Sequence, residues 1–277
     1  MRSIPRRRLV ALAAGACLSS ALLLLAGTVP SADAAGVYHG LLGLTSSSSS
    51  PSQSSNWFGY SQGVLDTGSP SMSIGGTWTV PTVSAHTAGQ AGDSATWIGI
   101  GGGCLTDAEC AAGDETLIQA GTEQDVNADG TTSYSAWYEI IPAPSTTVTL
   151  PVHPGDSITV TITQSVPGLW SIVIKDNTTG QTSTTSTPYS SDYSTAEWIT
   201  ETPLVIGSSG AGEASLPTLS TVGFTGATVN GSPAGLQAAQ EIQLVDSNGN
   251  VIGAPSAPGS GGASFNDCSW ASTCAAP

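Results

Sequence analysis

The sequence predicts an all-β protein, built as a two-sheet antiparallel β-sandwich. Three observations lead to this class: apolar and polar residues alternate with a period of two, turns rich in Gly and Pro separate the alternating runs, and strands do not alternate with helices. Outside the first 34 residues we find no convincing amphipathic helix, although residues 234–242 have room for one or two helical turns. We therefore expect one β-sandwich domain, residues 56–277.

The chain begins with the features of an export signal. Residues 1–8 are basic, an apolar stretch follows from about Leu9 to Leu25, and Ala32-Asp33-Ala34 supplies a small-residue cleavage site. This order predicts a signal peptide, residues 1–34, and hence a secreted, extracellular protein. A retained anchor is the alternative, because the apolar stretch is long enough to span a bilayer.

Residues 35–55 form a Ser-rich segment between the leader and the domain. Such a composition cannot supply a packed core. We interpret the segment as a linker or as a short propeptide.

Two runs in the domain show the strand pattern most clearly. Apolar and hydroxylated residues alternate throughout Ser157–Thr163, and Trp170, Ile172 and Ile174 repeat the pattern. These runs are predicted to be half-buried antiparallel strands. Farther along, Asn248-Gly249 predicts a tight hairpin between residues 243–245 and 251–252.

The charge balance of the chain limits its partners. Without residues 1–34, Lys175 is the only Lys or Arg against 19 Asp and Glu, a formal charge of −18. Such a surface repels nucleic acid and anionic lipid, and its self-repulsion fades as carboxylates protonate near pH 3 to 4. We therefore expect acidic working conditions and no nucleic-acid or membrane partner. The alternative is an acidic surface that serves only solubility.

Four cysteines remain after the leader, in two pairs that are close in sequence, Cys104 with Cys110 and Cys268 with Cys274. In an oxidising compartment each pair predicts a short local disulfide, although the sequence does not fix the connectivity. A metal site competes with this interpretation, but the spacing is wider than CxxC and no histidine lies near either pair. We expect neither a metal nor a cofactor.

Several catalytic classes lack their residues. The chain has no HExxH and no GxSxG sequence, and a Ser/His/Asp site would need one of the three histidines, which stand in the Ser-rich segment (His39) or in polar loops. Asp66-Thr67-Gly68-Ser69 matches the signature of pepsin-like aspartic peptidases, but that mechanism needs a second copy, which is absent. We interpret these four residues as a hairpin loop.

A series of segments that contain Trp, Gln or Glu occurs in a characteristic order along the domain. They are Asn56–Gly59, Thr77–Pro81, Trp97–Ile100, Leu117–Gly121, Ala136–Glu139, Pro154–Asp156, Asn177–Gln181 and Ala196–Glu201. In order and spacing they resemble the glutamic peptidases, the eqolisin family. The resemblance implies a concanavalin A-like or lectin-like sandwich with its substrate groove on the concave face, and a monomer that hydrolyses polypeptides.

The resemblance also implies two catalytic residues, Gln119 and Glu201. Glu201 would accept a proton from water and return it to the leaving amine, and the Gln119 amide would stabilise the oxyanion. Glu197 has the same strand parity as Glu201, so residue counting does not choose between them. The family pattern favours Glu201.

Further residues are candidates for substrate binding. Trp97 and Trp137 would line the groove, although a Trp in a sandwich commonly belongs to the core. Alternation places Trp137 and Glu139 on one side of their strand, and the residues that face the other side are Tyr134, Ala136, Tyr138 and Ile140. Glu139 and Glu197 are the other two candidates for substrate binding.

The chain also departs from the family pattern. Gly101-Gly102-Gly103 stands where relatives often have an aspartate after the Trp97 segment, and residues 35–55 lack the lysines of some inhibitory propeptides. Since His39 is the only ionisable base in residues 35–55, self-inhibition through charge is not expected. Two other functions stay open: a non-catalytic carbohydrate-binding or cell-surface module, and a glycosidase, which the lack of an E-x-D-x-E spacing around Glu139 disfavours.

Overall fold

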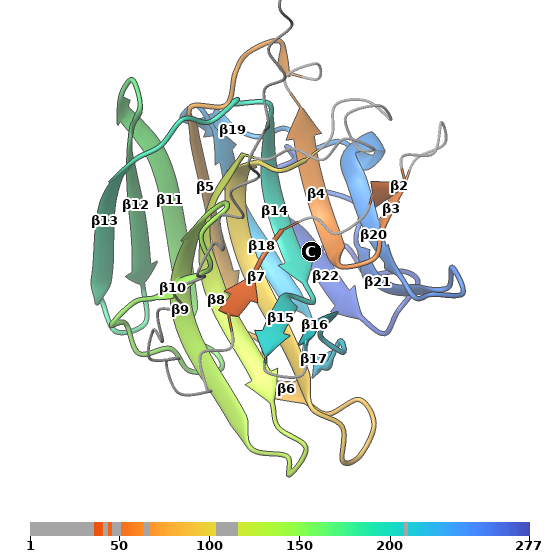
Figure 1. The fold of residues 1–277 in the computed structure, drawn as a ribbon. Helices are drawn as coiled ribbons and strands as arrows, with labels where there is room; N and C mark the ends of the chain where they lie inside the picture. The colour runs from red at the N-terminus through yellow and green to blue at the C-terminus, as the bar shows by residue number, and fades with distance from the viewer. Residues whose placement is uncertain (1–35, 41–43, 46–50, 64–66, 104–115, 208–209) are drawn as a thin grey trace, which may run out of the picture. The chain divides into compact units, whose positions relative to one another are not determined.

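Two layers of β-strands pack against each other in the computed structural model, which describes residues 36–40, 44–45, 51–63, 67–103, 116–207 and 210–277 (Figure 1). These residues lie within one compact unit, Ala34–Pro277. The predicted all-β sandwich is confirmed. The helical element with described bounds is a 3-10 turn, Ala238–Gln240, which lies inside residues 234–242, where the sequence leaves room for one or two helical turns. None of the described helical structure is long and apolar enough to cross a membrane.

The first layer contains the two runs with the clearest alternation. Its strands, in order of pairing, are β13 (Thr182–Pro188), β12 (Leu169–Asp176), β11 (Ser157–Val166), β5 (Ser73–Thr79) and β18 (Val222–Val229). The pairing continues through β22 (Phe265–Ser269), β21 (Val251–Pro255) and β20 (Glu241–Val245). The predicted hairpin at Asn248-Gly249 is thereby confirmed as the β20–β21 connection.

The second layer continues from β20 by hydrogen bonding. Its strands, in order, are β4 (Trp57–Gly63), β14 (Thr195–Glu201), β7 (Gly92–Gly101), β8 (Leu117–Val126), β9 (Thr132–Ile140) and β10 (Thr146–Thr147). All of these pairs are antiparallel. Because β14, β7, β8 and β9 are adjacent, segments that lie far apart in the sequence form one continuous surface.

The main core lies between the layers. It takes the apolar residues of the predicted alternation, including Ile158, Val160 and Ile162 from β11 and Trp170 from β12, all fully buried. Ala136 contributes from β9, whereas Trp137 belongs to a second apolar cluster. The expected opposite orientation of these two neighbours is therefore confirmed.

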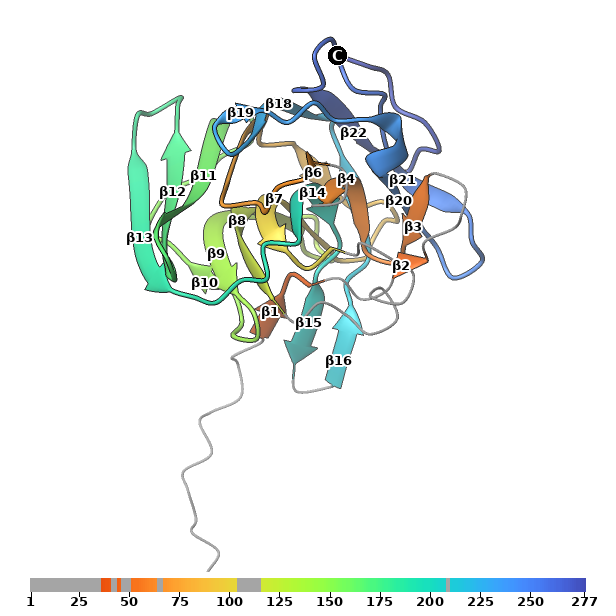
Figure 2. The same cartoon turned by 90° about the horizontal axis from the view of Figure 1, so that it is seen from above.

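Strands also form before Asn56, in the segment whose composition offers no core. β1 (Gly36–Tyr38) pairs with β15 (Leu204–Gly207), which pairs with β16 (Gly210–Glu213) in a small sheet visible at the lower edge of Figure 2. β2 (Leu44–Thr45) pairs with β3 (Ser52–Ser54), and β3 runs parallel to β20. Backbone hydrogen bonds, which need no apolar side chains, attach this segment to the domain.

The remaining elements are short. They are β6 (Val83–Ser84), paired with β17 (Thr218–Leu219), and β19 (Ser232–Pro233), paired with β18. The expected disulfide between Cys268 and Cys274 is present. Cys104, Cys110 and Asp66 lie outside the described residues.

Candidate active site

The register of four neighbouring strands brings the candidate catalytic residues to one face. Gln119 on β8 lies directly opposite Glu139 on β9. Ala95 on β7 lies between Glu201 on β14 and Glu123 on β8. These residues share the face of the second layer that carries the second apolar cluster, because side chains two residues apart on a strand point the same way. Its members are Trp57, Ala95, Trp97, Leu117, Trp137, Ile199 and Ile242.

A glycine makes room for this arrangement. Gly121 lies between Gln119 and Glu123 on β8, opposite Trp97. A Cβ at Gly121 would approach Thr96 O to 2.2 Å and the Cβ of Trp97 to 2.5 Å. The absence of a side chain therefore lets Trp97 lie across β8 between the two polar residues.

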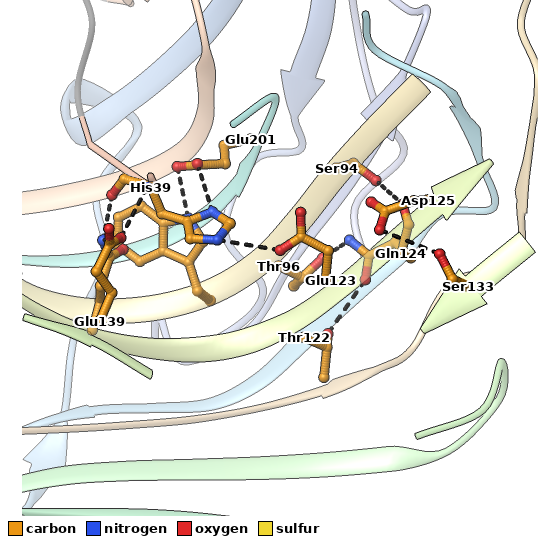
Figure 3. Close-up of polar contacts among 12 residues, drawn as sticks. His39, Ser94, Thr96, Thr122, Glu123, Gln124, Asp125, Ser133, Glu139 and Glu201 are labelled. Atoms are coloured by element: carbon orange, nitrogen blue, oxygen red, sulfur yellow. Dashed lines mark hydrogen bonds and ion pairs between the residues drawn. The ribbon is translucent and has the colours of Figure 1, made fainter. Parts of the chain in front are cut away.

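His39 occupies the centre of the site and is fully buried. Its Nδ1 lies 2.9 Å from Glu201 Oε1, and its Nε2 lies 3.2 Å from Glu123 Oε2. Its backbone N–H donates to Glu139 Oε2 at 2.8 Å. Figure 3 shows the three carboxyl groups around the His39 ring.

The two catalytic candidates meet at this histidine. The Gln119 side-chain amide donates to the carbonyl oxygen of His39 and, at 2.8 Å, to Glu139 Oε2. Glu201 contacts the His39 ring through Oε1, and its Oε2 accepts a hydrogen bond from Trp97 Nε1 at 2.9 Å. Gln119 and Glu201 therefore contact one and the same residue of an extended peptide segment.

The two tryptophans frame the histidine. The Trp137 ring stacks on the His39 ring with the centroids 3.7 Å apart and the planes 9° from parallel. Trp97 contacts Trp57 edge to face, with centroids 4.9 Å apart. Both belong to the second apolar cluster and both contact polar site residues, so the core and site interpretations apply together.

Burial and charge raise the pKa values of three side chains in the site, those of His39, Glu139 and Glu201. Burial alone would lower the pKa of His39, but the opposing attraction of Glu123 and Glu201 raises it to about 10. Burial raises the pKa of Glu139 to about 7, against the stabilising effect of the nearby His39. Burial also raises the pKa of Glu201, although hydrogen bonds from His39 and Trp97 oppose the shift. The site therefore binds protons more tightly than its separate side chains would.

Most of the predicted site residues come together. Gln119, Glu201, Trp97, Trp137 and Glu139 all belong to the contacts around His39. Glu197 lies on the same strand but in another environment, where its Oε1 accepts a hydrogen bond from Ser61 Oγ at 3.1 Å.

Two residues of the site, Glu123 and His39, are not among the candidates that the sequence predicts. Glu123 has the same parity as Gln119 on one strand, a signal that was available. His39 lies in the segment interpreted as a linker or a short propeptide, and no local pattern predicts that a residue 162 positions before Glu201 should lie against it.

Comparison with known proteins agrees with the geometry. The model of the peptidase A4 family matches residues 55–265. Aspergillopepsin-2 of Aspergillus niger is 31% identical over 170 residues, which is 53% of this chain and 56% of that protein, so the match spans about half of this relative's length.

Solved structures give a longer match. Scytalido-glutamic peptidase, determined with a transition state analog inhibitor, is 26% identical with a TM-score of 0.60, over 78% of this chain and 98% of that one. Aspergilloglutamic peptidase from Aspergillus niger is 27% identical with a TM-score of 0.50, over 64% and 98%. Because the model of the peptidase A4 family matches most of the length of this chain, the chain belongs to that family, the eqolisins.

Proposed function

We propose that this protein is a secreted, acid-acting endopeptidase in which Glu201 and Gln119 hydrolyse peptide bonds. One observation carries the proposal: the Gln119 amide donates to the peptide carbonyl of His39 while Glu201 contacts the same residue. A peptide carbonyl at this position has its oxygen on an amide donor, as an oxyanion-stabilising group requires. Membership of the peptidase A4 family supports the same reaction.

Glu201 is the proposed general base and acid. Its carboxylate accepts a proton from water, the water oxygen bonds to the scissile carbonyl carbon, and the proton passes to the amide nitrogen as the C–N bond breaks. Trp97 holds one oxygen of this carboxylate, which fixes its orientation. The raised pKa of buried Glu201 favours proton exchange in an acidic medium.

Gln119 is the proposed electrophilic partner. Its Nε2 donates to the oxygen that becomes negative in the tetrahedral intermediate. Its Oε1 is buried and accepts no hydrogen bond from the described residues, so it is available to orient the attacking water. An amide performs both tasks without titrating, which suits catalysis at low pH.

Site variants test this assignment on casein or haemoglobin at about pH 3. Glu201→Gln removes the proton acceptor and should lower kcat by about 10² to 10⁴, the usual worth of general acid–base catalysis. Gln119→Ala should lower kcat by about 10² to 10³, the usual worth of one oxyanion donor. Glu197→Gln serves as the matched carboxylate control and should keep most of the activity.

Other outcomes would reject parts of the proposal. A folded Glu201→Gln protein with full activity, beside an inactive Glu197→Gln protein, would move the role to Glu197. Equal activity at pH 3 and pH 7 would remove the acid requirement. A parent protein that digests no protein at any pH, but binds polysaccharide, would support the non-catalytic module instead.

A further inference from the structure

A pocket lies outside the active site, next to the end of the strand that carries Glu201. Its volume is about 560 Å³, and its walls come from the residues between β6 and β7, from the chain after β16, from the β20–β21 turn and from the loop after β22. Thr202, the residue after Glu201, lines the pocket, whereas Gln119, Glu139 and Glu201 do not. Binding sites for small groups have volumes of about 300 to 1,000 Å³, so this pocket is large enough to hold a ligand.

Trp270 forms one wall of the pocket and is the exposed tryptophan of this protein. Its side chain is 39% exposed, whereas each of the six other tryptophans is at most 1% exposed. Its Nε1 donates to the carbonyl oxygens of Leu216 and Pro217, both at 3.2 Å. The disulfide between Cys268 and Cys274 closes the loop that carries it. The Trp270 ring is therefore held in place without belonging to the core.

An exposed histidine adds a second ring to this wall. The His86 ring stacks on the Trp270 ring, with the centroids 3.5 Å apart and the planes 11° from parallel. His86 Nδ1 lies 3.3 Å from Thr218 Oγ1. Tryptophan is the side chain whose ring attracts organic cations most strongly, because the face of its π system is negative.

The buried part of the pocket lining is apolar. Leu216 and Leu244 are buried in a cluster with Phe58, and Ile252 packs against this cluster. Leu216, Leu244 and Ile252 all line the pocket. An aliphatic chain that enters the pocket would therefore contact aliphatic side chains.

Two carboxylates line the pocket from different elements, Glu213 on β16 and Asp246 after β20. The side chain and the backbone N–H of Asn250 and the backbone N–H of Asn248 donate to Asp246 at 2.8 to 2.9 Å. These hydrogen bonds lower the pKa of Asp246, so its charge persists farther into acid than that of an ordinary aspartate. His86 is the only basic side chain in the lining, so the two ionised carboxylates leave the pocket negative even when His86 is protonated.

We propose that this pocket is an exosite, a binding site apart from the catalytic residues, that holds a Lys or Arg side chain of the polypeptide substrate. The aliphatic stem of such a side chain fits the apolar lining, and its charged end fits Glu213 and Asp246. The chain without residues 1–34 carries a formal charge of −18, which also favours a basic partner. A neutral polysaccharide would contact the rings but would gain nothing from this charge. The proposal rests on the proposed function, because it takes a polypeptide as the substrate.

An acidic medium suits this form of recognition. Asp and Glu side chains of a substrate lose their charge in acid, whereas Lys and Arg keep theirs, so an unfolded protein presents mainly cations. Because Thr202 follows Glu201, a polypeptide held in the pocket is retained close to the catalytic residues. A second point of attachment raises the local concentration of substrate and lowers KM without taking part in the chemistry.

Binding is tested in the Glu201→Gln background, so that no peptide is digested. The probe is labelled hexalysine, and its fluorescence anisotropy at about pH 6 and low salt gives the Kd. Asp246→Asn combined with Glu213→Gln should weaken binding about tenfold, because it removes two charges but keeps a hydrogen-bond acceptor at each position. Trp270→Ala should weaken binding about fivefold. Asp129→Asn removes an exposed carboxylate outside the pocket and, as the matched control, should leave the Kd unchanged.

Two binding results would overturn the proposal. A Kd that is the same in the double variant and in the Asp129→Asn control would show that hexalysine responds to the overall charge and not to this pocket. Cellohexaose in excess should not displace hexalysine. Displacement that disappears in Trp270→Ala would assign the pocket to a carbohydrate.

Kinetics on proteins with active Glu201 connect the pocket to catalysis. The substrates are haemoglobin and haemoglobin with acetylated lysines, digested at about pH 4. The parent should have a lower KM for the unmodified substrate. Asp246→Asn combined with Glu213→Gln should raise this KM about fivefold with little change in kcat, and should reduce the difference between the two substrates. The Asp129→Asn protein should behave as the parent.

The two experiments separate this proposal from the proposed function. A parent that digests neither substrate at any pH, but binds hexalysine with the expected variant effects, would reject the peptidase activity and retain the pocket. Digestion with the same KM in the parent and in the double variant would reject the exosite and retain the peptidase activity.

Discussion

Glu139 accepts two hydrogen bonds with one oxygen, from the His39 N–H and from the Gln119 amide. The second contact decides which way the Gln119 amide points, since the NH₂ group must face the carboxyl oxygen. With its NH₂ group fixed in this way, Gln119 presents a donor, and not its own carbonyl, to a peptide oxygen. In the proposed mechanism Glu139 is therefore a positioning residue that acts through Gln119.

This role predicts a moderate kinetic effect. Glu139→Ala leaves the oxyanion donor present but free to rotate, so we expect kcat to fall about tenfold, less than for removal of the donor itself. KM should change by much less than kcat. Steady-state kinetics on a peptide substrate near pH 3 measures both constants. A Glu139→Ala protein with the kcat of the parent would show that Gln119 needs no such partner.

At the scale of the strand, Gly121 on β8 leaves the space that Trp97 on β7 occupies. Gly121→Ala should lower both the melting temperature and the activity, because the added Cβ meets the backbone oxygen of Thr96, which cannot move aside. Overpacking of this kind typically costs about 1 to 3 kcal/mol. Gly212→Ala on β16 is the control, since open space surrounds that position. Thermal denaturation compares the two, and equal melting temperatures would contradict the steric argument.

The strands also show how far the sequence could predict the site. Alternation places Trp137 and Glu139 on one face of β9 and Ala136 on the other, and this was predictable because the side-chain period of a strand is fixed. Alternation does not give the register between strands. Gln119 lies opposite Glu139 through the pairing of β8 with β9. Glu123 and Glu201 lie on either side of Ala95 through the pairings of β7 with β8 and β14. Only the folded chain fixes these pairings.

The segment before Asn56 was harder to predict for another reason. Its Ser-rich composition offers few apolar side chains for a core, but a strand that joins an existing sheet needs only backbone groups. β3 illustrates this, because its residues Ser52–Ser54 include no apolar side chain and yet pair with Ile242–Leu244 of β20. The contacts of His39 likewise depend on tertiary structure that local composition does not encode.

At the scale of the whole molecule, the buried acidic groups determine how stability varies with pH. Burial, with repulsion from Glu123 and Asp93, raises the pKa of Asp125 from 3.8 to about 8, and burial raises that of Glu139 from 4.5 to about 7. The pKa of His39 is raised from 6.5 to about 10. Each of these groups therefore keeps its proton in the folded protein at pH values at which the unfolded chain has lost it.

These shifts determine whether the free energy of unfolding rises or falls with pH. The slope of the unfolding free energy against pH is proportional to the protons bound by the unfolded chain minus those bound by the folded protein. Between about pH 4.5 and pH 8 this difference is negative for Asp125 and Glu139, and the stabilising contribution of protonated His39 is lost as pH rises from 6.5 toward 10. The melting temperature should therefore be highest in acid and should fall steadily toward pH 8.

Surface repulsion in an acidic protein changes stability in the same direction, so a matched pair of variants is needed to separate the two effects. Asp125→Asn removes a partly buried carboxyl group, and Asp129→Asn removes an exposed one from the same β8–β9 hairpin. Asp125→Asn should flatten the fall in melting temperature between pH 5 and pH 8, because it removes a proton that only the folded state retains. Asp129→Asn makes the same substitution at an exposed carboxylate that stays ionised throughout this range in both states, and it should keep the slope of the parent. Equal slopes in both variants would assign the pH dependence to the surface charge and not to the buried groups.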